Sequence, residues 1–344
     1  MRERDHIRAK NIDAGLDAFL EYRTVKPPSG EPGYSENDAL WVWDQDHSAG
    51  LITWLGHSGN VYPQGVERVT VFLPDGALLV HSEVGEQVTE ESPSGPGLVV
   101  QCEEPFRRWT YRYSGLAKRT TQAELRDGPM ADGRESVAIS VEATATMLAP
   151  PWVQGAFFES REEWRATPAA HFHGGYRYEQ LLHTDVSIRI DGGDGGSYDL
   201  SCTGTRTHRK GTRTLGNTPD GTDLYPGHIW MDVIFPSGRA LYVMQHCGAD
   251  GKPLDGADAW VREGDTFYRA ELRRPPIFRP TLAGEEHLSF ALESELGVVE
   301  IEGELVANCI NTMGLEPPSG WGVSWDAKEP ALLALSQGLS LIHI

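Results

Sequence analysis

Cysteine is scarce in this chain of 344 residues, and its few cysteines stand far apart. The four are Cys102, Cys202, Cys247 and Cys309. They show neither the C-x-x-C spacing of zinc sites nor the cysteine density of a small domain held together by disulfides. We therefore expect reduced thiols, most of them buried.

Long hydrophobic runs and basic residues are also in short supply. No stretch approaches the ~18 apolar residues of a membrane-spanning helix, and the charged N-terminus lacks the apolar run of a signal peptide. The chain has only 30 Lys and Arg but 50 Asp and Glu, which gives a formal net charge of -20. A surface of this sign repels phosphate backbones. These absences predict a cytoplasmic protein with no membrane span and no nucleic-acid partner.

The common nucleotide-binding and hydrolase motifs are missing too. The chain has no G-x-S-x-G, no P-loop, and no G-x-G-x-x-G after a strand. The glycine-rich DGGDGG at 191–196 is interpreted as a turn, because no helical pattern follows it. His171-x-His173 resembles half of a cupin metal site, but Glu179 follows too late and no glycine precedes the pair at the usual place. The sequence thus predicts no metal and no cofactor.

What the chain does have is the composition and rhythm of a packed β protein. Hydrophobic residues make up 39% of it, including ten Trp, eleven Tyr and ten Phe. Residues 11–22 carry apolar side chains at helical spacing and end before Pro27-Pro28, so we expect one short helix there. From Leu40 onward, short β-rich runs alternate with turn signals such as Pro74-Asp75-Gly76. This rhythm is typical of antiparallel barrels and sandwiches.

An internal repeat indicates two tandem units. VTVFLPDGALLV (69–80) aligns without gaps on MDVIFPSGRALY (231–242), so one hairpin recurs in each half of the chain. A second match, QAELRDGP (122–129) with RAELRRPP (269–276), has a different offset and counts for less. The predicted organisation is a helix and linker over 1–35, a first barrel over 36–155 and a second over 165–325. Residues 339–344 resemble a read-through tail and are left out of this prediction, because their native origin is not evident.

The parity of one hairpin places polar residues among apolar ones. Between Tyr178 and Ile190 the even positions form a largely apolar face, to which Leu182 belongs. After the turn, Tyr198, Leu200 and Cys202 form the matching face of the next strand. Continued through Gly204, the same parity directs Arg206 and His208 inward, within the basic stretch GTRTHRKGTRT at 204–214.

We expect this hairpin to close over residues 191–197. That register pairs Leu182 with Arg206 and Gln180 with His208, and it brings Tyr178 to Lys210. An unpaired buried Arg costs on the order of several kcal/mol, so the cluster must be wet, paired with a carboxylate, or facing a ligand.

Three structural alternatives remain open at this point. A β-bulge at Gly204 would turn Arg206 to solvent. The basic stretch could equally form a surface loop or a salt-bridge clamp between the two domains. Elsewhere, His183 and Asp185 are expected to be solvated, and Trp41, Trp43 and Trp54 to belong to the barrel core.

These residues resemble a known family. Gly175-Tyr176-Arg177-Tyr178-Glu179-Gln180 followed by Gly204-x-Arg206-x-His208-x-x-Gly211-x-Arg213 is similar to the second half of the tandem lipocalin-like proteins typified by hydroxyneurosporene synthase (carotenoid 1,2-hydratase). FLPDG (72–76) and EPFRRWTYRYSG (104–115) resemble the uncharacterised hydratase-like branch of that superfamily. The resemblance covers roughly residues 40 to 310.

The resemblance implies an all-β fold of two tandem antiparallel lipocalin-like (calycin-type) barrels with a pocket for an isoprenoid, a polyketide or a similar apolar molecule. The family often continues its His with Ser-Trp-Gly, whereas this chain has Arg209-Lys210-Gly211. An aromatic wall is therefore replaced by a basic side chain, which weakens the transfer of any specific reaction.

The leading hypothesis is a protein that binds an apolar small molecule and catalyses its cofactor-free hydration, dehydration or cyclisation, as a lyase or isomerase. His208 would be the acid or base, and Arg206 would hold a substrate oxygen. The other residues expected at the ligand are Tyr178, Gln180, Glu179, Leu182 and Arg213. The alternatives are a non-catalytic carrier of a hydrophobic ligand and a scaffold with two filled barrels. The sequence carries no signature of the oligomeric state or of the ligand's identity.

Overall fold

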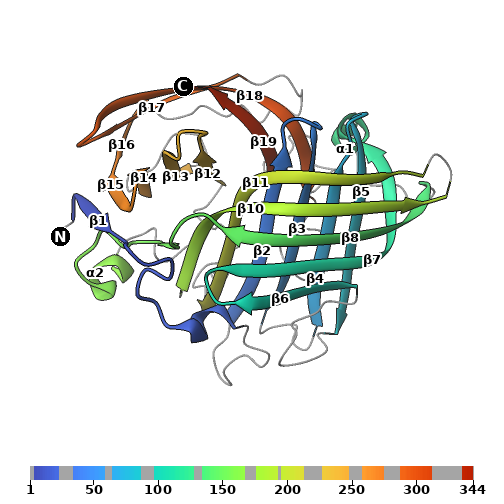
Figure 1. Ribbon diagram of the computed structural model, residues 1–344, viewed down its shortest axis with the longest axis horizontal. Coiled ribbons are helices and arrows are strands. Elements are labelled where there is room, and N and C mark those ends of the chain that lie inside the picture. The colour runs from blue at the N-terminus through green and yellow to red at the C-terminus, as the bar shows by residue number, and fades with distance from the viewer. Residues whose placement is uncertain are drawn as a thin grey trace, which may run out of the picture.

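The computed structural model is nearly all β (Figure 1). It describes residues 4–22, 34–58, 64–86, 97–127, 134–166, 176–192, 195–212, 227–247, 258–274, 287–311 and 335–343. Within them, antiparallel ladders join every pair of neighbouring strands, which confirms the predicted all-β class. None of the described helices is long and apolar enough to cross a membrane.

The first feature is an antiparallel sheet that closes into a barrel (Figure 1). Its strands, in order around the barrel, are β2 (Tyr34–Asp44), β3 (Ala49–Ser58), β4 (Gln64–Phe72), β5 (Ala77–Glu86), β7 (Arg108–Thr121), β8 (Ser136–Met147), β10 (Tyr176–Asp191) and β11 (Ser197–Thr212). Closure follows because β11 pairs with both β10 and β2. Two short strands extend the sheet, β6 (Leu98–Glu104) beside β7 and β9 (Trp152–Val153) beside β10.

The second feature is a pair of smaller antiparallel sheets. One has the order β1 (His6–Arg8), β15 (Thr266–Arg269), β14 (Asp258–Glu263), β13 (Ala240–Cys247) and β12 (Gly227–Ile234). The other has the order β16 (Glu271–Arg274), β17 (His287–Ser294), β18 (Gly297–Asn311) and β19 (Leu335–His343). The segment 335–343 thus pairs with β18, although part of it was left out of the fold prediction.

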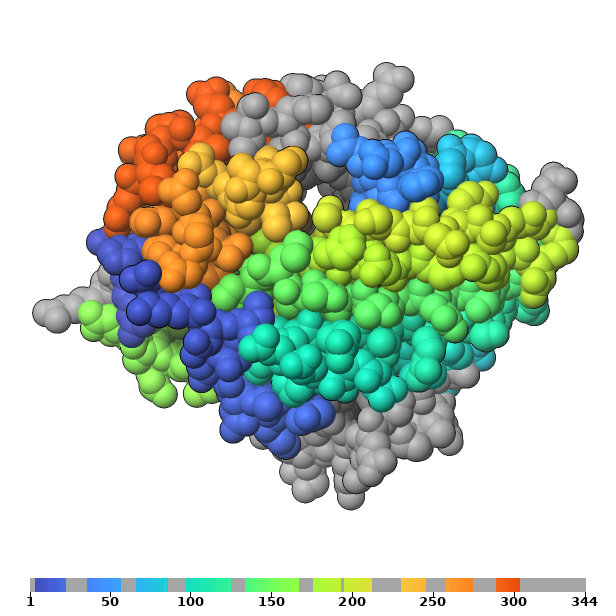
Figure 2. Space-filling model, viewed as in Figure 1, coloured from blue at the N-terminus to red at the C-terminus, as the bar shows by residue number. Residues whose placement is uncertain are grey.

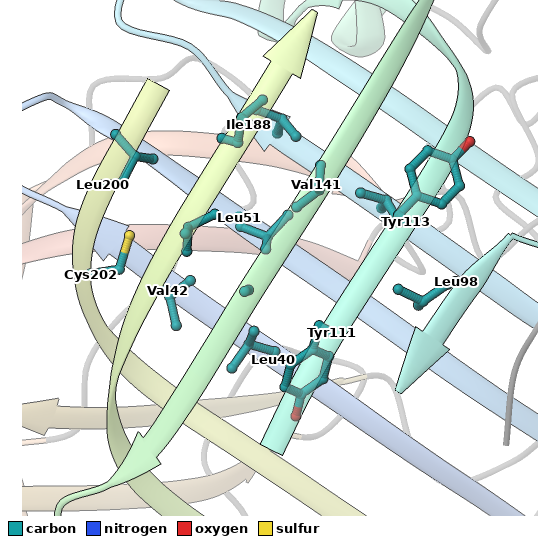
Figure 3. Packing of buried hydrophobic residues seen from close by; sticks show 14 of the residues in the cluster. Leu40, Val42, Leu51, Leu98, Tyr111, Tyr113, Val141, Ile188, Leu200 and Cys202 are labelled. Atoms are coloured by element: carbon teal, nitrogen blue, oxygen red, sulfur yellow. The ribbon is translucent and has the colours of Figure 1, made fainter. Parts of the chain in front are cut away.

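Three hydrophobic cores hold these layers together. The largest fills the barrel, where Figure 3 shows Leu40 and Val42 of β2 among side chains from the opposite wall such as Tyr111. A second lies between the two smaller sheets and includes Leu241 and Val243 of β13. The third packs the other face of β13, with Tyr242 and Met244, against the chain after β8. Because strand side chains alternate, the five-stranded sheet is buried on both faces.

The two segments that match in sequence both form β-hairpins. In both copies a Pro-x-Gly turn joins two paired strands, β4 to β5 and β12 to β13. The turn glycines have nearly the same backbone angle, with φ of 81° at Gly76 and 83° at Gly238. Equivalent residues also face equivalent interiors: Val71 lies in the barrel core, and Val233 packs against the core between the smaller sheets.

The weaker sequence match does not mark a structural repeat. Its first copy forms the short helix α1 (Gln122–Asp127), and its second copy enters strand β16. The expected N-terminal helix is also wrong for most of its length. Residues 11–15 form turns, and only the single 3-10 turn η1 (Ala18–Glu21) is helical, capped by the Asp17 side chain. A second short helix, α2 (Arg161–Arg165), follows β9.

The strand ladders cross the boundary that the sequence suggested between residues 155 and 165. β10 and β11 belong to the predicted second domain, yet they complete the barrel built by β2 to β8. The physical reason is edge pairing: without β10 and β11, strands β8 and β2 would each leave a row of backbone groups unpaired.

The expectation for the tryptophans is corrected as well. On β2 the inward residues are Leu40 and Val42, so Trp41 and Trp43 point out of the barrel. Trp41 contacts Trp230 of β12 with ring centroids 4.6 Å apart, and Trp54 lies under the Arg68 guanidinium. His183 and Asp185 contact one another at the surface, as expected.

Candidate functional site

The inward orientation predicted for Arg206 and His208 is confirmed, but the predicted register is wrong by two residues. Tyr178 lies opposite His208, and Gln180 lies opposite Arg206. The ladder continues closer to the turn than expected, because Gly192 adopts φ 85° and the Ile190 N–H donates to the Gly196 carbonyl. A shift of two keeps the side-chain parity, which is why the face was predicted correctly.

Gly204 does not form a bulge. The ladder between β10 and β11 runs through Leu182 and Gly204 without a register shift. A Cβ atom on Gly204 would lie 1.9 Å from the Trp41 carbonyl oxygen, so glycine is needed there for the close approach of β2. The strand therefore stays regular, and both Arg206 and His208 are buried.

Arg206 is the centre of a buried polar network, which we call the inner cluster (Glu21, Glu36, Asp38, Tyr178, Arg206 and His208). Its Nε donates to Asp38 Oδ2 at 2.8 Å, and its Nη1 donates to Glu21 Oε1 at 2.9 Å. The guanidinium carbon lies 3.8 Å from the centroid of the Trp109 ring. Burial alone would lower the pKa of Arg206, but Asp38 and Glu21 hold it well above its ordinary value. Arg206 is therefore a permanent cation, paired on two sides.

Glu21 attaches the N-terminal segment to one end of the barrel. Its Oε2 accepts the Phe106 backbone N–H at 2.8 Å and the Trp109 indole N–H at 2.7 Å. Its Oε1 accepts the Tyr178 hydroxyl as well as Arg206. Burial would raise the pKa of Glu21, but Arg206 and these hydrogen bonds outweigh it and lower the pKa to about 2. The carboxylate stays charged because all its neighbours donate.

His208 is held on both ring nitrogens. Nε2 lies 2.8 Å from Glu36 Oε1, and Nδ1 lies 2.9 Å from the Tyr178 hydroxyl. Nearby, the Gln180 amide donates to the backbone carbonyls of Phe106 and Ala149, both at 3.2 Å. Leu182 belongs to the hydrophobic core of the barrel. Arg206, His208, Tyr178, Gln180 and Leu182 are thus brought together, whereas Arg213 lies outside the described residues.

This arrangement decides among the earlier alternatives for the basic stretch. Arg206, His208 and Arg209 are each at most 2% exposed, so the stretch is not a surface loop. The carboxylates that pair with Arg206 come from η1 and β2, so the ion pairs join the N-terminal segment to the barrel.

A second buried polar network lies on the opposite face of the same hairpin. We call it the interface cluster (Gln154, Arg177, Glu179, Asp232 and Tyr242), because β12 contacts β10 and β11 there. Glu179 is 2% exposed, and its Oε1 accepts the Arg177 Nε–H at 2.6 Å. Tyr242 accepts the Gln154 amide at 3.1 Å. Seen from outside, the surface is hollowed between the gold β12–β13 strands and the yellow β11 (Figure 2).

Asp232 and Glu179 are buried carboxyl groups that repel one another. Burial, with the added repulsion of Glu179, raises the pKa of Asp232 well above its ordinary value. Burial also raises the pKa of Glu179, although Arg177 opposes the shift. Two like charges so placed are costly, so each carboxyl group favours the protonated form of the other.

Several polar atoms of this region make no hydrogen bond of ordinary geometry with any described residue. They are both carboxyl oxygens of Asp232, Glu179 Oε2, Gln154 Oε1 and the indole nitrogens of Trp230 and Trp260. Thr205 and Trp230 approach Asp232, and Thr207 approaches Glu179, closely enough to lower the pKa of each carboxyl group, but not in hydrogen-bonding geometry. Buried polar atoms are rarely left without partners, and such exceptions concentrate at functional sites.

A groove of about 570 Å³ opens beside the interface cluster. Its walls are Leu148 after β8, Ile234 at the end of β12, residues 237–239 of the next turn, and residues 262–264 between β14 and β15. Ile234 and Asp232 share one face of β12. Across the sheet, Ile234 is in register with Ala240 and Arg262, and Asp232 is in register with Tyr242 and Trp260.

The opposite wall shows the same succession. The Leu148 N–H donates to the Leu181 carbonyl at 2.9 Å, and Leu181 shares the outward face of β10 with Glu179. On each wall the carboxyl-bearing residue lies two positions along its strand from the residue next to the groove. Asp232 is thus about 7 Å along β12 from Ile234, and Glu179 is about 7 Å along β10 from Leu181. On both walls the acid pair therefore lies one row of side chains inward from the groove.

The sequence did not point to seven of the eleven residues in the two clusters. Glu36 and Asp38 share the parity of Leu40 and Val42 on β2, and that signal could have placed them inside the barrel. Asp232 stands in the repeat where the first copy has Thr70, so a charged residue in an apolar strand was visible. Glu21 had no such signal, because its contacts come from distant strands.

One other group among the described residues has potential metal ligands. Atoms of Glu67, His81 and Glu83 converge to within 4.8 Å of one another. Glu67 is already held by His81 Nε2 at 2.8 Å and by the backbone N–H groups of Gly97 and Leu98. These bonds attach the start of β6 to the barrel.

Fold and site together define an all-β protein with a closed antiparallel barrel and a buried acid pair outside it. No protein-family model matches the chain, and no curated protein matches it. Among solved structures, the crystal structure of CghA with Sch210972 gives a TM-score of 0.46 at 13% identity, over 91% of this chain and 89% of that one. Another crystal structure of CghA gives 0.47 at 12% identity, over 98% and 97%. At these values the likeness assigns no family to the chain, and the resemblance to the hydroxyneurosporene synthase family stays a prediction.

Proposed function

We propose that this protein binds a mainly apolar small molecule between the barrel and the five-stranded sheet, and exchanges a proton with it through Asp232 and Glu179. The observation that carries this proposal is the unpartnered state of three buried carboxyl oxygens on facing strands. The adjoining groove supplies an entrance, and the stacked rings of Tyr242 and Trp260 supply an apolar wall. Concave, largely apolar sites with a few convergent polar groups are where ligands bind.

The acid pair suits cofactor-free addition or elimination at a carbon–carbon double bond. In a hydration, Asp232 gives its proton to one carbon, a water oxygen bonds to the other, and Glu179 takes the proton that the water loses. Transfer of a proton from Glu179 to Asp232 restores the starting state. Dehydration is the reverse. In a cyclisation the same proton donation is followed by attack of a second double bond, and Glu179 removes the proton lost at the end.

Within this proposal Arg206 and His208 are positioning residues rather than catalytic ones. Their inner cluster joins η1, β2, β10 and β11 through ion pairs and hydrogen bonds. Tyr178, a member of this cluster, directly precedes Glu179 in the chain. We propose that the inner cluster fixes the β10–β11 hairpin, and with it the position of the Glu179 carboxyl group.

Native mass spectrometry of the full chain tests the function. The purified protein is incubated with a lipid and polyketide extract, and retained masses are compared between wild type, Asp232→Asn and Glu179→Gln. We expect wild type to convert a retained compound into a product that differs by one water or is isomeric, and both variants to retain it unchanged. Glu142→Gln, an exposed carboxyl change on β8, is the control and should behave as wild type.

Two other results have definite meanings. Retention without conversion by the wild type would identify a carrier and contradict the proton-transfer role. Retention of no compound by any of the proteins would contradict the binding site itself.

A further inference from the structure

The groove next to the acid pair contains a guanidinium group whose hydrogen bonding is incomplete. Arg262 lines the groove from β14, and its buried Nε makes no hydrogen bond with any described residue. It stands in register with Ala240 and Phe267, on the same face as Trp260, so it points toward the barrel side of the sheet. A donor of this kind is costly to bury unless an acceptor reaches it.

The other charges of the groove leave Arg262 as the group available to a ligand. Arg239 donates to Glu263 at 2.8 Å, so these two rim charges balance one another. Asp265 is close enough to favour the charged form of Arg262, but its carboxylate is hydrogen-bonded to another arginine, accepting the Arg8 Nε–H at 3.0 Å. The rest of the groove near Arg262 is apolar, with Leu148 and Ile234.

We infer that the ligand of this protein carries a carboxylate, which binds Arg262 in the groove while its apolar body extends to Asp232 and Glu179. This inference rests on the proposed function and adds the substrate class. Guanidinium groups bind carboxylates through paired N–H donors, which satisfies the free Nε and fixes the direction of the ligand.

The geometry also limits where the reacting carbon lies. Arg262 is in the row of Ile234, and Asp232 is in the next row on the same face. Two residues along a strand span about 7 Å, and the two strand spacings from β12 to β14 span about 10 Å, so the backbone positions of Arg262 and Asp232 lie roughly 12 Å apart. The double bond that receives the proton therefore lies several carbon–carbon bonds away from the carboxylate, near the far end of an extended chain rather than beside the head group. Substrates that are apolar acids with unsaturation at this distance fit both ends of the site.

Ligand binding to the full chain tests the inference with two probes that differ only in the head group, lauric acid and lauryl alcohol. Binding is followed by intrinsic tryptophan fluorescence, because Trp152, Trp230 and Trp260 lie near the site. We expect wild type to bind the acid at least about tenfold more tightly than the alcohol, the difference typical of a charged hydrogen bond. Arg262→Met should remove this preference, and Arg262→Lys should keep part of it.

Arg189→Met is the control, since Arg189 is a surface arginine that pairs with Asp199 and does not line the groove. It should keep the preference for the acid. Equal affinity of wild type for acid and alcohol would overturn the carboxylate inference while leaving the proposed site in place. Binding of neither probe would instead contradict the proposed function. The comparison of the two probes on wild type does not depend on any variant, so it tests the inference even if a variant fails to fold.

Discussion

Tyr178 and Glu179 are neighbours on β10, yet their side chains enter different buried networks on opposite faces of the sheet. Tyr178 binds Glu21 and His208 inside the barrel, and Glu179 binds Arg177 outside it. In the first network the carboxylates of Glu21 and Asp38 accept hydrogen bonds from Arg206. In the second, the carboxyl groups of Glu179 and Asp232 lie close together, and three of their oxygens make no hydrogen bond with a described residue. The contrast separates a structural cluster from a candidate reactive one.

Replacing Asp232 by Asn should stabilise the protein increasingly as the pH rises. The folded-state pKa of Asp232 is raised, so between the ordinary Asp pKa and this raised value the folded protein holds a proton that the unfolded chain has released. Wild-type stability therefore falls as the pH rises through that window, by about 1.4 kcal/mol for each pH unit. Asn carries no charge and avoids this loss. Urea unfolding at about pH 5 and about pH 8 measures the difference, and a pH-independent gap would contradict it.

Replacing Arg206 by Met should destabilise the fold by about 3–5 kcal/mol, because Glu21 and Asp38 would be left buried without their cation. Arg189→Met is the control, since Arg189 pairs with Asp199 at the surface and the change should cost about 1 kcal/mol or less. Denaturant unfolding gives both values. Adding Glu21→Gln and Asp38→Asn to Arg206→Met should recover part of the loss. If Arg206→Met proves neutral, the guanidinium is not the centre of the cluster.

Acid should release the N-terminal segment from the barrel. The pKa of Glu21 is about 2 in the folded protein, below its ordinary value of 4.5. The stability that this lowered pKa contributes is present above the ordinary value and is lost as the pH falls from there toward the folded-state value. The Phe106 amide donates to Glu21, so its protection against hydrogen exchange, measured relative to an unstructured chain at the same pH, should fall in this range. In Glu21→Gln the same amide should already be less protected at neutral pH, and its protection should change little with acid.

Gly204→Ala should be among the most damaging single-methyl changes in the chain. Its Cβ would lie 1.9 Å from the Trp41 carbonyl oxygen, so β2 and β11 would have to separate. We expect a loss of about 3 kcal/mol, the upper end of the range for overpacking. Gly196→Ala is the matched control, because its Cβ would find only ordinary contacts with Tyr198. Thermal unfolding of the two variants should separate them clearly, and similar midpoints would show that the strands yield to the methyl group.

The thiols of Cys102 and Cys202 should react slowly with iodoacetamide at neutral pH. Burial, together with Glu21, raises the pKa of Cys102 to about 12, and burial with Asp44 raises that of Cys202 to about 12. The reactive thiolate is therefore rare. Mass spectrometry of peptides after alkylation measures the extent, and alkylation in urea provides the reference. Rapid modification in the folded protein would contradict the burial.

Local patterns in the sequence were enough to predict the strands, the two matching hairpins and the inward orientation of Arg206. Each depends on alternation or on turn residues, which are properties of a few consecutive positions. These patterns were not enough to predict the register between β10 and β11, because several turn lengths suit a run of glycines. The helix expected at residues 11–22 is wrong because this segment packs at the end of the barrel, where tertiary contacts favour turns and η1 over a longer helix.

The sequence by itself determined an all-β chain with a hairpin that occurs twice and a hairpin whose two faces differ. Only the tertiary structure decided which sheet each hairpin joins, and with it the role of every polar group. Arg206 became a structural cation because Glu21 and Asp38 reach it from segments far away in the chain. Glu179 became a candidate acid–base group because β12 brings Asp232 against it. Such pairings depend on burial and on long-range contacts, which no short stretch of sequence specifies.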